Sequence, residues 1–219
     1  MVQSKRKRSA SAMAKMDTAE LVQMLDGRDC DIAVEVLSER DDINPLSLFE
    51  IIRNNDEAED AYRVLDSLDP ATLGPCALAC ADMLKEESDG VRVAASAAFD
   101  VMREMDSATY AQHGPACVAK LSGMLGDDKV EVRRLALQAM GAFMKTERML
   151  EYTELFVGKL NDESQEVREE AVKVLSLLDA ATLAKHAAEI KPVAYGMLER
   201  EGIDHFACIV MDKCDDEEA

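Results

Sequence analysis

Tryptophan is absent from this sequence of 219 residues, and aromatic residues make up only 4% of it. Residues that interrupt helices are also scarce, with five prolines and ten glycines. Alanine, leucine, methionine and glutamate are abundant instead, and these are strong helix formers. Because apolar residues still account for 48% of the chain, we expect a folded, helical protein in which proline and glycine mark the helix ends.

Long hydrophobic runs are missing as well. No apolar run approaches the length of about 18 residues that a membrane-spanning helix requires. The N-terminus lacks the apolar core of a secretory signal. The sequence therefore predicts no membrane association and a cytoplasmic location.

The residues that usually carry chemistry form no recognisable motif. The six cysteines contain no Cys-x-x-Cys pair, and three histidines are too few to complete a zinc site. A phosphate-binding glycine loop and the hydrolase and kinase signatures are also absent. Cys76 and Cys80 are four residues apart, on one helix face, and fit reduced core positions of an intracellular protein. We predict no catalytic residue, no metal and no cofactor.

The net charge is −19, and it is unevenly distributed. Residues 1–15 contain five basic and no acidic residues, whereas the remainder has 20 basic and 44 acidic residues. Such an acidic body disfavours direct binding of nucleic acid. It suits a basic protein partner or simply solubility, and the charge alone leaves both interpretations open.

One frame of residues occurs three times. Leu84, Leu125 and Leu160 are each followed seven residues later by Val-Arg, then by alanine four residues on. Large apolar residues follow the valine at +8 and +11, and the three alanines are spaced 41 and 35 residues apart. These positions line one face of a helix, and the spacing predicts a repeat architecture. The framed residues are Val91, Ala95, Phe99 and Met102; Val132, Ala136, Met140 and Phe143; and Val167, Ala171, Leu175 and Leu178.

A second pattern follows the first and third of these helices and an earlier one, and in the middle repeat Thr146-Glu147-Arg148-Met149 replaces it. Asp69, Asp106 and Asp179 begin an Asp-x-Ala-Thr sequence, and aspartate is a good N-cap for a new helix. We predict a turn here and a second helix that opens near Pro75, Pro115 or Pro192, since proline fits the first helical turn.

Leu125–Ala136 (LGDDKVEVRRLA) and Leu160–Ala171 (LNDESQEVREEA) resemble the HEAT repeat. The resemblance is good over residues 57–207 and weak over 16–56. It implies an all-α fold in which about five antiparallel helix pairs stack into an α-α superhelix, or α-solenoid. Armadillo repeats are the close alternative. We expect a basic tail at 1–15, the solenoid at 16–210 and an acidic tail at 211–219.

The same resemblance implies a structural ladder, because the loop aspartate and the Val-Arg arginine of HEAT repeats commonly pair between neighbouring units. Its members here would be Asp128, Arg133, Asp162 and Arg168, joined by Asp89 and Arg92.

Solenoids bind other chains along surfaces lined by their second helices. The favoured function is therefore a non-enzymatic protein-interaction scaffold or adaptor with a protein partner. Candidate contacts are the polar positions of the second helices: Gln112, His113, Lys120, Glu151, Tyr152, Glu154, Lys185 and His186. The alternative is a HEAT-like bilin lyase or pigment-protein chaperone, for which no local sequence signature can be tested.

The N-terminal run Lys5-Arg6-Lys7-Arg8 has three interpretations that stay open. It resembles a minimal nuclear-import signal, which would add a nuclear location. With Ser9 it also resembles a basophilic kinase site, where a phosphate would offset the local positive charge. In the third interpretation the basic tail leans on the acidic body of its own chain.

Overall fold

The computed structural model describes residues 12–26, 30–40, 42–54, 59–201 and 205–215. Every regular element in these ranges is a helix. The chain divides into two compact units, Met1–Cys117 and Val118–Ala219. Among the described helices, none is both long and apolar enough to cross a lipid bilayer.

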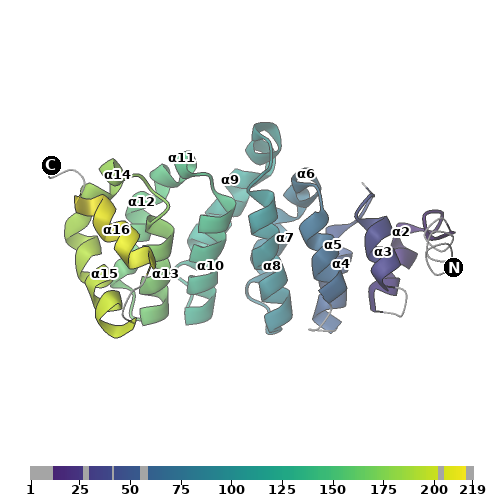
Figure 1. Cartoon of the computed structure of the whole chain (residues 1–219), viewed down its shortest axis with the longest axis horizontal. Coiled ribbons are helices and arrows are strands. Elements are labelled where there is room, and N and C mark those ends of the chain that lie inside the picture. The colour runs from purple at the N-terminus through teal and green to yellow at the C-terminus, as the bar shows by residue number, and fades with distance from the viewer. Residues whose placement is uncertain (1–11, 27–29, 41, 55–58, 202–204, 216–219) are drawn as a thin grey trace. The chain divides into compact units, whose positions relative to one another are not determined.

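The first unit contains three successive helix pairs, α3 with α4, α5 with α7, and α8 with the start of α9 (Figure 1). Short helices cap or connect them. The elements are α2 (Thr18–Gln23), η1 (Met24–Asp26), α3 (Cys30–Leu37), α4 (Pro45–Asn54), α5 (Glu59–Ser67), α6 (Pro70–Leu73), η2 (Gly74–Cys76), α7 (Ala77–Met83), α8 (Asp89–Met102) and α9 (Ser107–Met124).

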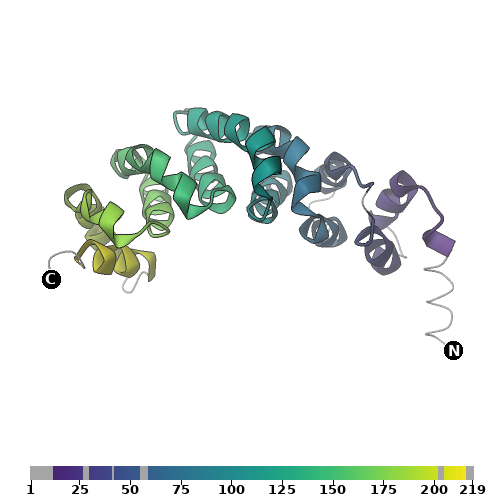
Figure 2. The ribbon, with the colours of Figure 1, turned by 90° about the horizontal axis from the view of Figure 1, so that it is seen from above.

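The second unit contains the pairs α10 with α12 and α13 with α15, and α16 then packs against α13, α14 and α15 (Figure 2). Its elements are α10 (Val130–Phe143), α11 (Thr146–Met149), η3 (Leu150–Tyr152), α12 (Thr153–Gly158), η4 (Lys159–Asn161), α13 (Gln165–Leu175), α14 (Ala180–Ala184), α15 (Ala187–Glu201) and α16 (His205–Asp215). The predicted fold class, an all-α solenoid of about five helix pairs, is confirmed.

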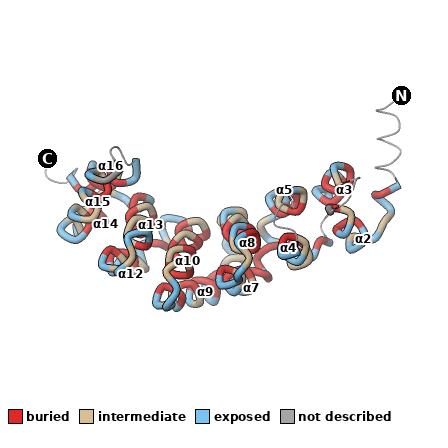
Figure 3. The backbone as a smooth tube through the Cα atoms, turned by 90° about the horizontal axis from the view of Figure 1, so that it is seen from below, coloured by how far each residue is buried: buried red, intermediate tan, exposed pale blue. Residues whose placement is uncertain are grey.

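The repeated frame forms the core. All twelve framed valines, alanines and large apolar residues are buried, as are Leu84, Leu125 and Leu160. Within each unit the buried positions lie on the sides of the helices that face one another (Figure 3). The small alanine at +4 leaves room for a neighbouring helix to approach, because it places only a methyl group between the backbones.

The Asp-x-Ala-Thr turns act as predicted. The Asp69 and Asp106 carboxylates each accept a hydrogen bond of 2.7 Å from a backbone N–H two residues on, at Ala71 and Ala108. Asp179 accepts one of 2.7 Å from the N–H of Thr182. Hydrogen bonds from the Thr109 backbone lower the pKa of Asp106. The three aspartates therefore start new helices by satisfying N–H groups that have no partner within the helix.

The expected opening of the second helices at Pro115 and Pro192 is wrong. Helix α9 runs without interruption from Ser107 with Pro115 inside it, and α15 likewise contains Pro192. Proline removes the hydrogen bond to the carbonyl four residues earlier. In both helices the proline and that earlier residue, Ala111 or Ala188, are exposed, so water can satisfy the carbonyl. Of the three prolines expected to open second helices, Pro75 alone lies where a helix begins, in the short 3-10 helix η2 before α7.

The C-terminal boundary also differs from the expected tail at 211–219. Helix α16 extends to Asp215, with Met211 and Cys214 buried. The Lys213 ammonium donates hydrogen bonds of 2.8 and 2.7 Å to the carbonyls of Ser176 and Leu178, at the end of the preceding first helix. These contacts attach α16 to the rest of the second unit. The acidic composition of residues 211–219 therefore did not predict that α16 extends to Asp215.

Ser96, on α8, generates a prediction about stability. Its hydroxyl is buried and has no hydrogen-bond partner in the described part of the chain. Since a buried polar group without a partner carries a desolvation penalty, Ser96→Ala should raise the free energy of unfolding by about 1 kcal/mol. Chemical denaturation measures the change. Ser176→Ala is the matched control, because the buried Ser176 hydroxyl does donate to the Lys173 carbonyl at 2.6 Å, and it should not stabilise.

Candidate functional site

Each Val-Arg arginine uses one guanidinium nitrogen, Nη1, in the same way. It donates hydrogen bonds to the backbone carbonyls six and five residues earlier, in the loop that precedes its own helix. The three sets are Arg92 with Glu86 and Glu87 at 2.5 and 2.9 Å, Arg133 with Asp127 and Asp128 at 2.9 and 3.2 Å, and Arg168 with Asp162 and Glu163 at 2.8 and 3.0 Å. The sequence pattern did not predict these backbone contacts.

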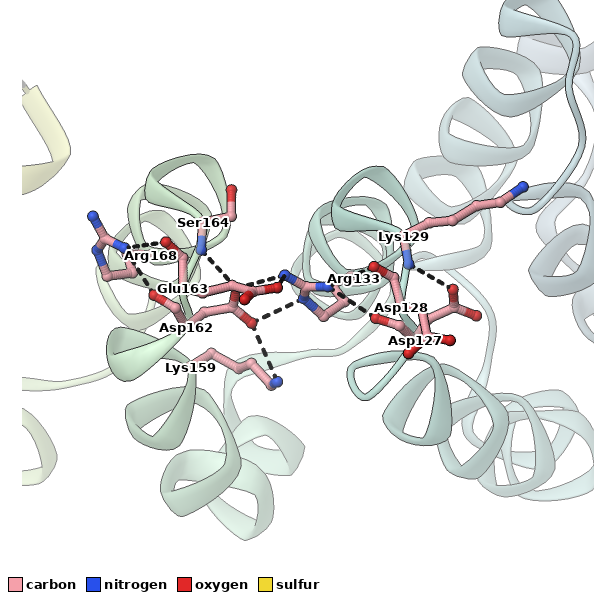
Figure 4. Close-up of polar contacts among 9 residues, drawn as sticks. All are labelled: Asp127, Asp128, Lys129, Arg133, Lys159, Asp162, Glu163, Ser164 and Arg168. Carbon is pink, nitrogen blue, oxygen red and sulfur yellow. Dashed lines mark hydrogen bonds and ion pairs between the residues drawn. The ribbon is translucent and has the colours of Figure 1, made fainter.

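Arg133 also reaches the next repeat of the second unit. Its Nε and Nη2 donate to the two carboxylate oxygens of Asp162 at 3.0 and 2.8 Å (Figure 4). The two side chains are only 7% and 6% exposed, which makes this a bidentate, desolvated ion pair. Glu163 and Lys159 contribute ion pairs at the edge, at 3.2 and 3.5 Å. Asp128 of the predicted ladder enters this network through its carbonyl.

The ionisation of Asp162 depends on this pair. Burial of the carboxyl raises its pKa, but hydrogen bonds from Arg133 and from the Ser164 N–H outweigh that effect, so the pKa lies below its usual range. The Ser164 bond, at 3.0 Å, ties Asp162 to the start of α13. One carboxylate therefore fixes the position of its own helix and links it to α10.

The first unit uses different contacts for the same purpose. Arg92 forms an ion pair with Asp89, three residues before it on the same helix. The link to a neighbouring first helix comes from Tyr62 on α5, whose hydroxyl donates to the Gly90 carbonyl at 2.7 Å. Arg92 and Arg133 thus share their loop contacts and differ in how they reach other side chains.

The predicted contact residues divide between the units. Gln112 and His113 belong to the first unit, where Gln112 is exposed and His113 half-buried. The others belong to the second, with Lys120 and Tyr152 half-buried and Glu151 and Lys185 exposed. Two of them meet, since Nε2 of His186 lies 3.8 Å from a carboxylate oxygen of Glu154 on the preceding repeat.

Leu150 lies beside these residues and was missed by the sequence reasoning. It directly precedes Glu151 in η3 and is 43% exposed, which is unusual for a large apolar side chain in this fold. The frame marks only the positions that repeat, so it carries no signal for this residue. Lys5–Arg8 and Ser9 lie outside the described residues.

The described residues offer little chemistry. No three histidine, cysteine or acidic side chains among them are placed to share a metal ion. Cys76 and Cys80 are buried, as expected of core residues. Burial raises the pKa of both thiols, and the neighbouring Cys76 and Cys117 add to the effect at Cys80. A thiol is a poor nucleophile when its pKa is raised, so these cysteines suit packing.

The threefold frame and the paired helices that it builds define an all-α repeat fold, similar to that of armadillo and HEAT repeats. No protein-family model and no characterised protein matches the sequence. Several solved structures have a similar fold, at 15% sequence identity. Two engineered proteins align with TM-scores of 0.54 and 0.50, over 92% and 91% of this chain and 99% and 95% of theirs. A designed armadillo repeat protein aligns over 91% of this chain and 99% of its own, with a TM-score of 0.48.

Removing Arg133 should be more damaging than removing its counterpart in the next repeat. Arg133→Ala should lower the free energy of unfolding by about 4 kcal/mol, because it leaves a buried carboxylate without its cation. Arg168→Ala is the matched control. It deletes the same two carbonyl contacts but no ion pair within the described residues, and it should cost about 1–2 kcal/mol. Equal losses in urea denaturation would contradict a stabilising role for the Asp162 pair.

The same pair predicts a pH dependence. Because the folded-state pKa of Asp162 is lowered, its contribution is fully present above the unfolded pKa of about 3.9 and is lost as pH falls through the lower folded value. Asp162→Asn should therefore be less stable than the natural protein at neutral pH, and the difference should shrink at about pH 3. Denaturation midpoints of both proteins at the two pH values test this. A constant difference would show that Asp162 does not act through its charge.

Proposed function

We propose that this protein is a non-enzymatic scaffold or adaptor that binds a protein partner through the second helices of its second unit. The proposal rests on the meeting of Glu154 and His186, which brings polar side chains of successive repeats to one place. We call this place the α12–α14 surface, and it consists of Leu150, Glu151, Glu154, Lys185 and His186.

The composition of the α12–α14 surface supports binding. Protein interfaces usually combine an apolar centre with a polar rim. Leu150 supplies an exposed apolar side chain, and Glu151, Glu154 and Lys185 supply exposed charges. None of the five residues is framed, so a change at any of them leaves the repeated core intact.

The charge of the chain favours a basic partner. With a net charge of −19, it attracts positively charged chains over distances set by the ionic strength. The same charge opposes direct binding of nucleic acid. The proposal includes a cytoplasmic location and requires no cofactor.

Charge reversal tests the surface. Affinity purification with the tagged natural protein identifies partners, and their affinities are then measured against Glu151→Lys combined with Glu154→Lys, two exposed acids of this surface. We expect the double variant to weaken binding about tenfold or more, since a reversed charge at an interface replaces attraction by repulsion. Glu166→Lys is the matched control, because Glu166 is an exposed acid on α13, and it should bind normally. Unchanged affinity of every partner for the double variant would refute the surface.

The bilin-lyase alternative has a separate readout. A lyase or pigment chaperone should retain a chromophore or co-purify with a pigment protein, and the absorbance spectrum of the protein isolated from its natural source reveals either. Visible absorbance would count against the scaffold proposal, and a colourless protein with a basic partner would support it.

A further inference from the structure

We propose that Tyr195 binds an arginine side chain of a protein partner, together with Glu199 and Gly158. We call these three residues the Tyr195 site. The inference rests on the proposed function, because it names the chemistry by which a partner would be recognised. The site shares no residue with the α12–α14 surface and belongs to the second unit alone.

The ring of Tyr195, on α15, is available to a ligand. Tyr195 is the most exposed of the four tyrosines and five phenylalanines of the chain, at 54%. Neither its ring nor its hydroxyl has a partner in the part of the chain that the structure describes. The face of a tyrosine ring attracts cations, and tyrosine is common among the residues that dominate binding energy at interfaces. A cation from another molecule can therefore reach this ring.

Glu199 places a carboxylate on the same side of α15, one turn after Tyr195. It is exposed and forms no ion pair within the described residues. Lys191, one turn before Tyr195, pairs with Asp215 of α16 at 2.5 Å. A free ring and a free carboxylate four residues apart match arginine, because its planar guanidinium both stacks on aromatic faces and pairs with carboxylates. The net charge of −19 favours such a cationic partner.

Gly158 lies at the position of the preceding second helix that corresponds to Tyr195. Leu160 and Met197 are buried, and the exposed residues two places before them are Gly158 and Tyr195. Helix α15 contacts η4, which directly follows Gly158. Since packed helices lie about 8–10 Å apart, an arginine on Tyr195 would extend over Gly158 or along α15 to Glu199.

The fold itself gives no reason for a glycine at 158. Its backbone is right-handed helical, with φ −57° and ψ −29°. A Cβ added there would meet no atom within 4 Å. Glycine weakens a helix relative to alanine, so the residue lowers stability without improving the packing. Room for a ligand beside Tyr195 accounts for it.

Two capped, fluorescently labelled peptides, octa-arginine and octa-lysine, test the site in the full chain. They carry the same charge and differ in the guanidinium group, so octa-arginine should bind more tightly at about 0.15 M salt, measured by fluorescence anisotropy. Tyr195→Ala should weaken octa-arginine about threefold or more, the size expected of a cation–π contact, and should affect octa-lysine less. Phe206→Ala is the matched control, because Phe206 is also an exposed aromatic residue of this unit, and both affinities should stay unchanged.

A pair of charge variants separates the site from the overall charge. Glu199→Gln and Glu189→Gln remove one negative charge each from the same helix. Glu189 is exposed but lies about 120° around α15 from Tyr195. Only Glu199→Gln should weaken octa-arginine severalfold.

Gly158→Leu separates binding from stability. It should weaken octa-arginine severalfold by filling the space beside the ring. The urea midpoint should stay the same or rise, because leucine is the better helix former. A lower midpoint would show that the fold does require glycine at 158.

The proposal is overturned if the two peptides bind equally well, if Tyr195→Ala and Phe206→Ala have equal effects, or if Glu199→Gln and Glu189→Gln do. Its failure differs from that of the proposed function. If natural partners need Glu151 and Glu154 but bind Tyr195→Ala normally, the Tyr195 site is refuted and the α12–α14 surface stands. If the peptides behave as expected but every partner ignores the Glu151 and Glu154 reversal, the α12–α14 surface is refuted and the Tyr195 site stands.

Discussion

The hydrogen bonds from each Val-Arg arginine to two loop carbonyls are the contacts on which the repeats depend. The carbonyls of a loop that turns sharply into the next helix have no partner in a helix, so side chains must satisfy them. Arg92, Arg133 and Arg168 do so with a side chain that is always charged and carries several donors. Holding the loop in this way sets where the following helix starts, and hence which residues face the core.

Asp162 builds on that arrangement. The loop that Arg168 holds through the Asp162 carbonyl presents the Asp162 side chain to Arg133 of the preceding repeat. Its carboxylate also accepts from the Ser164 N–H, where α13 begins. The Asp162 carbonyl thus helps to close the loop, and the Asp162 carboxylate both caps the start of α13 and connects two repeats. The geometry explains why this carboxylate remains ionised although it is buried.

The fold could be predicted because its determinants are side chains at regular spacing. Buried valines and alanines give a helix face, and Asp69, Asp106 and Asp179 mark helix starts. Other features leave no such trace. Every residue has a backbone carbonyl, so the sequence does not show which carbonyls accept hydrogen bonds from Arg133. The tolerance of Pro115 within α9 depends on the exposure of Ala111, which is a tertiary property. The exposure of Leu150 and the closeness of Glu154 to His186 depend equally on packing.

The arginine contacts also bear on how such an array could change length during evolution. Each arginine binds the loop of its own repeat, so a duplicated repeat would contain both the arginine and the loop carbonyls that it binds. It would need no new loop contact from neighbouring repeats. The length of the segment between successive frames can then vary, as the spacings of 41 and 35 residues between framed alanines illustrate. In the longer repeat the single helix α9 takes the place of the separate elements α11, η3 and α12. Selection can therefore remodel the second helices while the first helices keep their register.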